Sequence, residues 1–541
     1  MPERRPPEKE TLPLRPPVDV YDTTLRDGTQ REGLSLSLED KLRVARRLGA
    51  FGARFIEAGW PGSNPKDAAF FEKARGERFG QAELVAFGST VRPGVEPSDD
   101  LQLRALLDAE TKVITLFGKS WTRHVEGVLR ISREENLRMI EASVAFLRGR
   151  GRRVFYDAEH FFDGYREDAA YALETLKAAE RGGAEVLVLC DTNGGSMPWD
   201  VEEVVRRVRA ELRTPLGIHA HDDGGCAVAN SLAAVRAGAT QVQGTINGYG
   251  ERCGNANLCT IVPDLELKLQ RRCVGPDKLA ELVSVARFVA EVANLPPDAH
   301  APYVGRSAFA HKGGVHVSAM RRDEASYQHV EPERVGNVSR VVVSELSGKS
   351  NVLSKAEELG LSPSAGAEAR VVRTIKEREA QGYAYEAAEA SVALLLARQR
   401  ERHAPAFVVL DYRTSAQRRR GTTPWSEATV KVAVGDEERV AAGEGSGPVA
   451  ALDAALREAL GSALPELEEI QLADYKVRIL DGHDGTEATT RVLVECRRGS
   501  QRWSTVGASK NIVEASLEAL VDGYEYGLLE LDEAAKVAGR S

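Results

Sequence analysis

The residues most suggestive of chemistry are two histidines separated by one residue, in the stretch GIHAHDDGG at residues 217–225. Successive residues of a β-strand point to opposite faces, so His219 and His221 would project to the same side. The preceding TPLGI is apolar and bounded by proline and glycine, as expected of a buried strand. Two convergent imidazoles at a strand end are typical of a metal site. Surface pairs and packed core histidines are the alternatives.

A carboxylate that would complete such a site occurs near the start of the chain, in TLRDGTQ. Two neutral imidazoles and one carboxylate can bind a divalent ion that polarises a substrate oxygen, and we choose Asp27 as the carboxylate. Asn255, in GERCGNAN, is either a weaker oxygen ligand or a turn residue. Arg26 suits an oxygen that gains negative charge in a transition state, with a structural ion pair as its alternative role.

Length and composition limit the kind of protein that carries these residues. A chain of 541 residues suggests about two to four domains. The net charge of −9 argues against a nucleic-acid surface, and no apolar run approaches the length of a membrane span. Residues 1–17 are proline-rich without an apolar signal segment, which predicts a flexible tail. Six cysteines without a CxxC pair favour a cytoplasmic location.

The elements that must position the candidate residues follow a repeated strand–helix pattern. Eight β-rich apolar runs alternate with helical patterns, several of which end in glycine where a helix is expected to stop. Eight such units in about 250 residues predict a (β/α)8 TIM barrel, which we place at residues 18–290. An open doubly wound sheet is the alternative. No GxGxxG motif follows the first strand, which weakens the case for an open sheet that binds a dinucleotide.

The barrel prediction can be checked against the polar residues of the chain. Active sites of such barrels lie at the carboxyl ends of the strands, so polar residues should gather there. The predicted strands end in Asp, His, Asn and Thr more than in the Lys and Glu of a solvated rim, and this favours a metal site. The residues concerned are Asp22, Arg26, Asp27, Glu57, Asp157, Glu159, His160, Asp191, Thr192, Asn193, His219, His221 and Asn247.

Three segments resemble a known family. YDTTLRDGTQREG, HAHDDGGCAVANSLAAVRAGA and GTINGYGERCGNANL are similar to signatures of the isopropylmalate, homocitrate and citramalate synthases. This family belongs to a larger group of metal-dependent barrels that includes hydroxymethylglutaryl-CoA lyase. The resemblance runs from about residue 18 to the C-terminus. Within the family, VFYDAEHFFDGY and LCDTNGG are most similar to the longer bacterial citramalate synthases.

The resemblance implies a reaction and its cofactor. Such an enzyme condenses acetyl-CoA, its co-substrate, with pyruvate and water to give (R)-citramalate and CoA, in isoleucine biosynthesis. Asp27, His219 and His221 would hold a divalent ion (Mn, Mg or Zn), with Asn255 at or near it. The 2-oxo acid would chelate this ion through its ketone and carboxylate oxygens.

The resemblance also assigns residues to catalysis and substrate binding. Arg26 would bind the ketone oxygen and stabilise the alkoxide formed on it, and Thr192 would bind the pyruvate carboxylate. Glu159 and His316, with Tyr327 close by, are similar to the acid–base residues that remove a proton from the acetyl methyl group. Without the resemblance, a histidine in this position would more often be an ordinary helix-face residue, which is the alternative for His316.

Other functions remain open at this point. Several relatives have an aromatic residue in the oxo-acid pocket where this chain has Asp157 or, with a shift of one, Tyr156. An isopropylmalate or homocitrate synthase would differ only in the pocket lining, and one apolar exchange is worth about 1–3 kcal/mol in selectivity. A non-catalytic metabolite sensor is the alternative from another class, and a lyase that cleaves the carbon–carbon bond is a third.

The remainder of the chain predicts two further regions. Residues 291–404 begin with the prolines of a linker and continue as amphipathic helices. Residues 405–541 hold an internal repeat, in which each copy reads strand, turn, strand, glycine-rich bend and helix. We expect a duplicated α+β regulatory domain that forms a homodimer. The resemblance implies isoleucine as its feedback effector, with plain dimer scaffolding as the alternative.

Overall fold

The computed structural model describes residues 16–359, 366–400, 404–418, 420, 423–499 and 501–538. All but two residues of the expected N-terminal tail, 1–17, lie outside this range. The chain divides into two compact units, which are described separately below. The first consists of Met1–Phe309 with Val330–Val338, and the second of Ala310–His329 with Ser339–Ser541.

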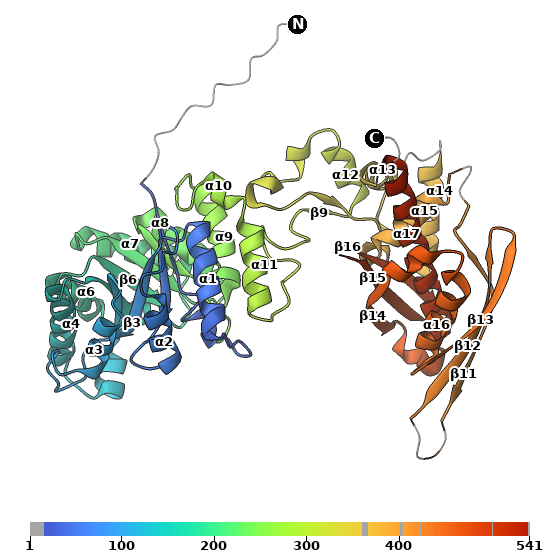
Figure 1. The fold of residues 1–541 in the computed structure, drawn as a ribbon. Helices are drawn as coiled ribbons and strands as arrows, with labels where there is room; N and C mark the ends of the chain where they lie inside the picture. Colours follow the sequence, from blue (N-terminus) through green and yellow to red (C-terminus); the bar gives the residue numbers. More distant parts are fainter. Residues whose placement is uncertain are drawn as a thin grey trace, which may run out of the picture. The chain divides into compact units, whose positions relative to one another are not determined.

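The first unit is a closed barrel of eight parallel strands, which confirms the predicted (β/α)8 fold (Figure 1). Each strand pairs with the next in the chain, and β1 closes the barrel by pairing with β8, with Asp22 opposite Gly244. The strands are β1 (Asp19–Asp22), β2 (Phe55–Gly59), β3 (Glu83–Ser89), β4 (Val113–Lys119), β5 (Arg153–Glu159), β6 (Val186–Asp191), β7 (Leu216–Ala220) and β8 (Gln241–Gly244).

Three of the barrel helices end at glycine, as the sequence predicts. Ser37 caps the first of them in a reciprocal capping box with Asp40. Gly52, Gly183 and Gly238 end three helices with φ between 93° and 117°, a conformation that favours glycine. The helices are α1 (Leu38–Phe51), α2 (Pro65–Ala74), α3 (Leu101–Asp108), α4 (Arg133–Gly149), α5 (Phe161–Glu167), α6 (Ala169–Gly182), α7 (Pro198–Glu211), α8 (Ala227–Ala237), α9 (Leu258–Pro263), α10 (Pro276–Leu279) and α11 (Leu282–Val292).

Five strand residues form a small core of their own: Tyr21, Phe55, Val85, Val113 and Phe155. Phe55 meets Phe155 edge to face, with ring centroids 5.0 Å apart. The larger core lies between the strands and the surrounding helices. Side chains at the carboxyl ends of the strands are therefore held by rigid, fully packed elements.

The second unit begins with a short parallel sheet and four helices. In the sheet β9 (Ala310–His311) pairs with β10 (Arg340–Val341). The helices are α12 (Gly314–Met320), α13 (Lys349–Glu358), α14 (Ala367–Ala380) and α15 (Glu389–Ala397). The predicted helices of this region are thus accompanied by two short strands. Among the described residues, no helix combines the length and apolar character needed to cross a membrane.

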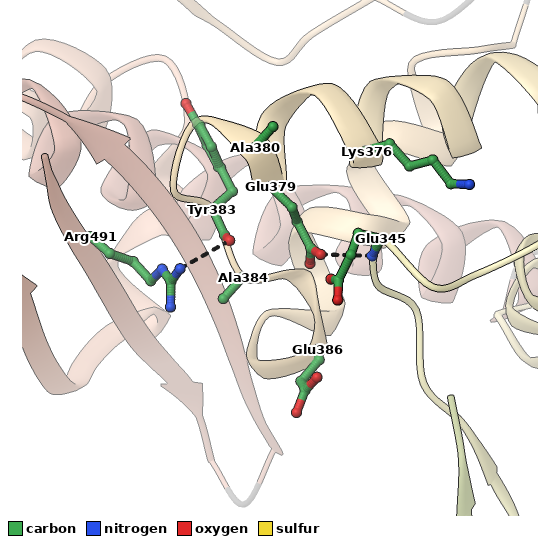
Figure 2. Close-up of a pocket in the computed structure, with 8 residues that line it drawn as sticks. All are labelled: Glu345, Lys376, Glu379, Ala380, Tyr383, Ala384, Glu386 and Arg491. Carbon is green, nitrogen blue, oxygen red and sulfur yellow. Dashed lines mark hydrogen bonds between the residues drawn. The ribbon is translucent and has the colours of Figure 1, made fainter. Parts of the chain in front are cut away.

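A pocket of about 350 Å³ lies in this unit between α14, the loop after it and β15 (Thr490–Arg498) (Figure 2). The Glu379 carboxylate accepts the backbone N–H groups of Glu345 and Tyr385, at 2.7 and 3.0 Å. Burial and the Glu345 carboxyl group raise the pKa of Glu379 to about 7. The lining residues are Glu345, Lys376, Glu379, Ala380, Tyr383, Ala384, Glu386 and Arg491.

The C-terminal part contains the predicted duplication, with one difference. Each copy has three antiparallel strands before its helix, and the repeat seen in the sequence contains only the second and third. The first strands, β11 and β14, mix exposed and half-buried residues without clean alternation, so no period of two marks them. The copies are β11 (Val408–Gln417), β12 (Trp425–Val434), β13 (Glu437–Gly445) and α16 (Pro448–Gly461), then β14 (Gln471–Ile479), β15, β16 (Gln501–Ser509) and α17 (Ile512–Ala538).

The duplication extends to fine details of the backbone. The pairing register shifts between Val409 and Asp411 in β11, and between Leu472 and Asp474 in β14. Each third strand also has a glycine where its helix crosses closely. A Cβ on Gly443 would lie 2.3 Å from the backbone nitrogen of Ala455, and one on Gly507 would lie 2.1 Å from the carbonyl oxygen of Ala515.

Candidate metal and active site

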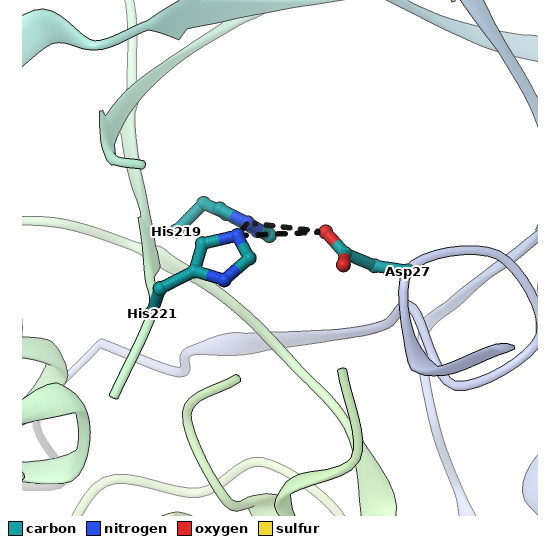
Figure 3. A group of neighbouring side chains, drawn as sticks. All are labelled: Asp27, His219 and His221. Carbon is teal, nitrogen blue, oxygen red and sulfur yellow. Dashed lines mark hydrogen bonds and ion pairs between the residues drawn. The ribbon is translucent and has the colours of Figure 1, made fainter. Parts of the chain in front are cut away.

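Three of the predicted metal ligands converge inside the barrel (Figure 3). Asp27 follows β1, His219 lies in β7 and His221 follows β7 directly. The Nε2 atoms of the two imidazoles are 3.2 Å apart, and Asp27 Oδ2 lies 3.4 and 3.8 Å from them. In the described part of the chain, this is the one cluster of three or more His, Cys, Asp or Glu residues with such convergent atoms.

The charges of these groups suit a cation. Burial acts to raise the pKa of Asp27, but Arg26 and the two imidazoles outweigh it and lower that pKa to about 2. Burial and the neighbouring His221 lower the pKa of His219 to about 3, and burial lowers that of His221. An anionic carboxylate therefore faces two neutral imidazoles, whose free nitrogens can act as ligands.

Unpartnered polar atoms around the cluster also fit a bound metal. Asp27 Oδ1 and Asn255 Oδ1 are buried and have no hydrogen-bond partner among the described residues. Asn255 forms an isolated antiparallel bridge with His221, and its Nδ2 donates to the carbonyl oxygen of Tyr249 at 3.2 Å. Both oxygens lie beside the cluster and are available to a cation.

Arg26 is held beside the cluster by two carboxylates and one aromatic ring. Its Nε donates to Glu57 Oε1 at 2.6 Å, and its Nη1 donates to Asp27 Oδ2 at 3.1 Å. The guanidinium carbon lies 3.8 Å from the centroid of the Phe87 ring. No hydrogen bond among the described residues uses Nη2, so this nitrogen can donate to a substrate oxygen. Arg26 therefore forms the ion pairs expected of a structural role, and its role toward a substrate oxygen stays a prediction.

Glu57 anchors Arg26 and is itself fixed by the barrel core. Its Oε2 accepts the hydroxyl of Tyr21 at 2.7 Å, and that hydroxyl also lies 2.7 Å from Thr115 Oγ1. Burial raises the pKa of Glu57 even though Arg26 opposes the shift. The sequence placed Glu57 at a strand end but gave it no role. Glu57 is the residue that aligns the guanidinium.

Glu159 and Thr192 lie at the ends of β5 and β6. Glu159 forms an ion pair with Lys119, which lies directly opposite it on β4. Thr192 Oγ1 accepts the backbone N–H of His160 at 2.8 Å. His160 has a φ of 55°, an unusual value for a residue other than glycine. Lys119 cannot be recognised as this partner from the sequence, because only the strand register places it beside Glu159.

His316 and Tyr327 form a pair of their own. His316 is exposed on α12, and its ring stacks on that of Tyr327 with centroids 4.4 Å apart. Tyr327 is 42% exposed. Both belong to the second unit, whereas the metal ligands, Arg26, Glu159 and Thr192 belong to the first. The predicted site residues thus form two groups on two units of the chain.

Comparisons with protein families match three regions of the chain. Residues 17–289 match the HMGL-like family, and residues 303–382 match the homocitrate synthase post-HMGL domain-like family. Residues 386–528 match the LeuA allosteric (dimerisation) domain. The first match covers the barrel, and the third covers both copies of the C-terminal repeat as far as residue 528, within α17.

Full-length relatives agree with these matches. The chain is 52% identical to the (R)-citramalate synthase of Geobacter sulfurreducens, over 95% of this chain and 98% of the relative. It is 54% identical to that of Synechocystis sp., over 94% and 96%, and 42% identical to that of Sulfolobus acidocaldarius, over 94% and 97%. The chain therefore belongs to the (R)-citramalate synthase family of acyl-transferring condensing enzymes.

Proposed function

We propose that this protein condenses acetyl-CoA with pyruvate and water to give (R)-citramalate and CoA. The observation that carries the proposal is the convergence of Asp27, His219 and His221 beside a guanidinium with a free Nη2. Full-length relatives named (R)-citramalate synthase at 52% and 54% identity support the choice of substrates. The product would enter isoleucine biosynthesis.

Asp27, His219 and His221 would hold a divalent ion, with Asn255 beside it. Manganese, magnesium and zinc are the expected ions, and any of them would polarise the ketone of the 2-oxo acid. Arg26 Nη2 would donate to the same ketone oxygen as negative charge develops on it. The Thr192 hydroxyl would bind the pyruvate carboxylate, with its oxygen held by the His160 N–H.

The remaining residues would move protons. Loss of a proton from the methyl group of acetyl-CoA requires a base, and we assign Glu159 and His316 as the acid–base pair of this step, with Tyr327 stacked on His316. The resulting enolate carbon forms a bond to the ketone carbon of pyruvate, whose oxygen then takes up a proton. Water finally hydrolyses the thioester, which releases the citramalate carboxylate and the thiol of CoA.

The other regions would regulate and assemble the enzyme. We propose that residues 405–541 form a regulatory domain that binds isoleucine and joins two chains into a homodimer in the cytoplasm. The match to the LeuA allosteric (dimerisation) domain supports oligomerisation through this region. Residues 291–404 would link this domain to the barrel of residues 18–290.

The test is thiol release from acetyl-CoA with a divalent metal, against pyruvate, 2-oxobutyrate, 2-oxoisovalerate and 2-oxoglutarate. Preference for pyruvate, with loss of activity in EDTA and in His219→Ala, is the expected result. Faster turnover of 2-oxoisovalerate or 2-oxoglutarate would make the protein an isopropylmalate or homocitrate synthase. Metal binding without thiol release from any acid would indicate a metabolite sensor.

A further inference from the structure

We propose that Gln243 and Asp157 act as a positioning relay that fixes which ring nitrogen of His219 carries the proton. The inference rests on the proposed role of His219 as a metal ligand, and it assigns work to two buried polar residues that the mechanism leaves unused. Gln243 lies in β8 and Asp157 in β5, 24 and 62 residues away from His219 in the chain.

The strand register brings the first two residues together. β7 and β8 are adjacent parallel strands, and His219 lies opposite Gln243 in their pairing. The Nδ1 of His219 is 3.1 Å from Oε1 of Gln243. Gln243 is completely buried and His219 is 6% exposed, so water does not compete for this bond. The amide is therefore the fixed partner of Nδ1.

This partner decides the form of the neutral imidazole. A neutral imidazole carries one proton, on either Nδ1 or Nε2. The amide oxygen can only accept, so it selects the form with the proton on Nδ1 and leaves a lone pair on Nε2. That lone pair is directed at the cluster, because Nε2 lies 3.4 Å from Asp27 Oδ2 and 3.2 Å from Nε2 of His221.

Asp157 fixes the direction of the amide itself. A glutamine amide can be turned by half a rotation with little change of shape, and the turned amide would offer N–H to Nδ1 and favour the wrong form of His219. In the observed direction Gln243 Nε2 donates to Asp157 Oδ1 at 3.1 Å. Asp157 Oδ1, as the acceptor of this bond, holds the amide in the observed direction.

The same strand offers a matched control. Gln241 lies two residues before Gln243 in β8 and is 1% exposed. Neither its amide oxygen nor its amide nitrogen has a hydrogen-bond partner among the described residues. Gln241→Met and Gln243→Met therefore remove an amide of equal size from the same buried strand, and only the second removes a bond to His219.

The first measurement is Mn²⁺ affinity, by titration calorimetry with the metal alone. Loss of a group that orients a ligating histidine typically weakens metal binding about 10–100-fold, and we expect such a loss in Gln243→Met. Gln241→Met should bind Mn²⁺ like the wild type. Equal losses in the two variants, or none in Gln243→Met, would overturn the proposal.

A double-mutant cycle tests the part played by Asp157. The Gln243→Met variant has no amide, so in that background there is no direction left to fix. Asp157→Leu should therefore weaken Mn²⁺ binding in the wild type and leave it unchanged in the Gln243→Met background. A loss of the same size in both backgrounds would show that Asp157 acts only through packing and would overturn its place in the relay.

A metal-free readout separates this inference from the proposed function. Long-range ¹H–¹⁵N spectra of metal-free protein with ¹⁵N-labelled histidine report which ring nitrogen is protonated, and His219→Ala identifies the signals of His219. We expect the Nδ1-protonated form in the wild type and in Gln241→Met, and its loss in Gln243→Met. The Nε2-protonated form in the wild type would overturn the relay. Absence of Mn²⁺ binding with the Nδ1-protonated form present would overturn the metal-dependent function alone.

Discussion

Replacement of Arg26 by lysine gives the sharpest test of the proposed chemistry. The substitution keeps the positive charge but removes the planar group whose Nε and Nη1 bind Glu57 and Asp27, at 2.6 and 3.1 Å. It also removes the stacking on Phe87 at 3.8 Å. A lysine ammonium cannot hold both carboxylates in this geometry and also present a donor in the place of Nη2.

The expected loss of kcat follows from the removal of Nη2, the donor that would bind the ketone oxygen in the transition state. Removal of one aligned donor to a developing oxyanion typically lowers kcat about 10²–10³-fold, or about 2.7–4 kcal/mol. Because the metal ligands and Thr192 would still bind pyruvate, its KM should change far less than kcat. Steady-state thiol release with pyruvate as the varied substrate measures both quantities.

Arg153→Lys is the matched control for this experiment. Arg153 lies at the opposite end of the barrel, at the start of β5, where it binds Glu83 and Glu185 at 2.9 and 2.8 Å. The same exchange there should change thermal stability and leave kcat unaltered. A kcat for Arg26→Lys close to that of Arg153→Lys would refute the role of Nη2. An increase in KM alone would show that Arg26 binds ground state and transition state equally.

Three further predictions follow from the structure. Mn²⁺ at about 100 times its Kd should stabilise the barrel by about 2.7 kcal/mol, seen as a thermal shift that Asp27→Ala abolishes; a shift that survives would place the metal elsewhere. Gly507→Ala should destabilise the C-terminal domain by about 1–3 kcal/mol or more in urea unfolding, because its Cβ would clash with the Ala515 carbonyl oxygen. Gly461→Ala is the control, since a Cβ there meets no atom within 4 Å and should not destabilise the domain. The pKa of Glu379 is raised from 4.5 to about 7, so the folded state favours its protonated form and stability falls as pH rises through this range. Glu379→Gln should remove this loss of stability. An unchanged slope of the unfolding free energy against pH in the variant would contradict the raised pKa of Glu379.

Much of the fold was predictable because its signals are local. The eight strands and the helices between them are visible as apolar runs and helical periods, and glycine marks helix ends such as Gly52 and Gly238. The first strand of each C-terminal copy escaped detection. β11 and β14 have partly exposed faces, and the apolar alternation that reveals a strand requires one buried face and one solvated face.

The candidate site was predictable in its residue types and not in its internal connections. His219 and His221 share a face because they are two residues apart in a strand, and Asp27 follows another strand end of the same barrel. Both features are properties of short segments of the chain, which the sequence pattern reveals. The sequence by itself therefore determined the set of groups able to hold a metal ion.

Only the tertiary structure decided how these groups are held. Glu57 aligns Arg26, Lys119 pairs with Glu159, and Gln243 meets His219. Each of these pairs is separated by 24 to 40 residues in the chain. Sequence patterns carry the period of a strand but not the register in which one strand lies against the next. Closure of the barrel fixes that register for all eight strands together, and with it the pairs Lys119–Glu159 and His219–Gln243.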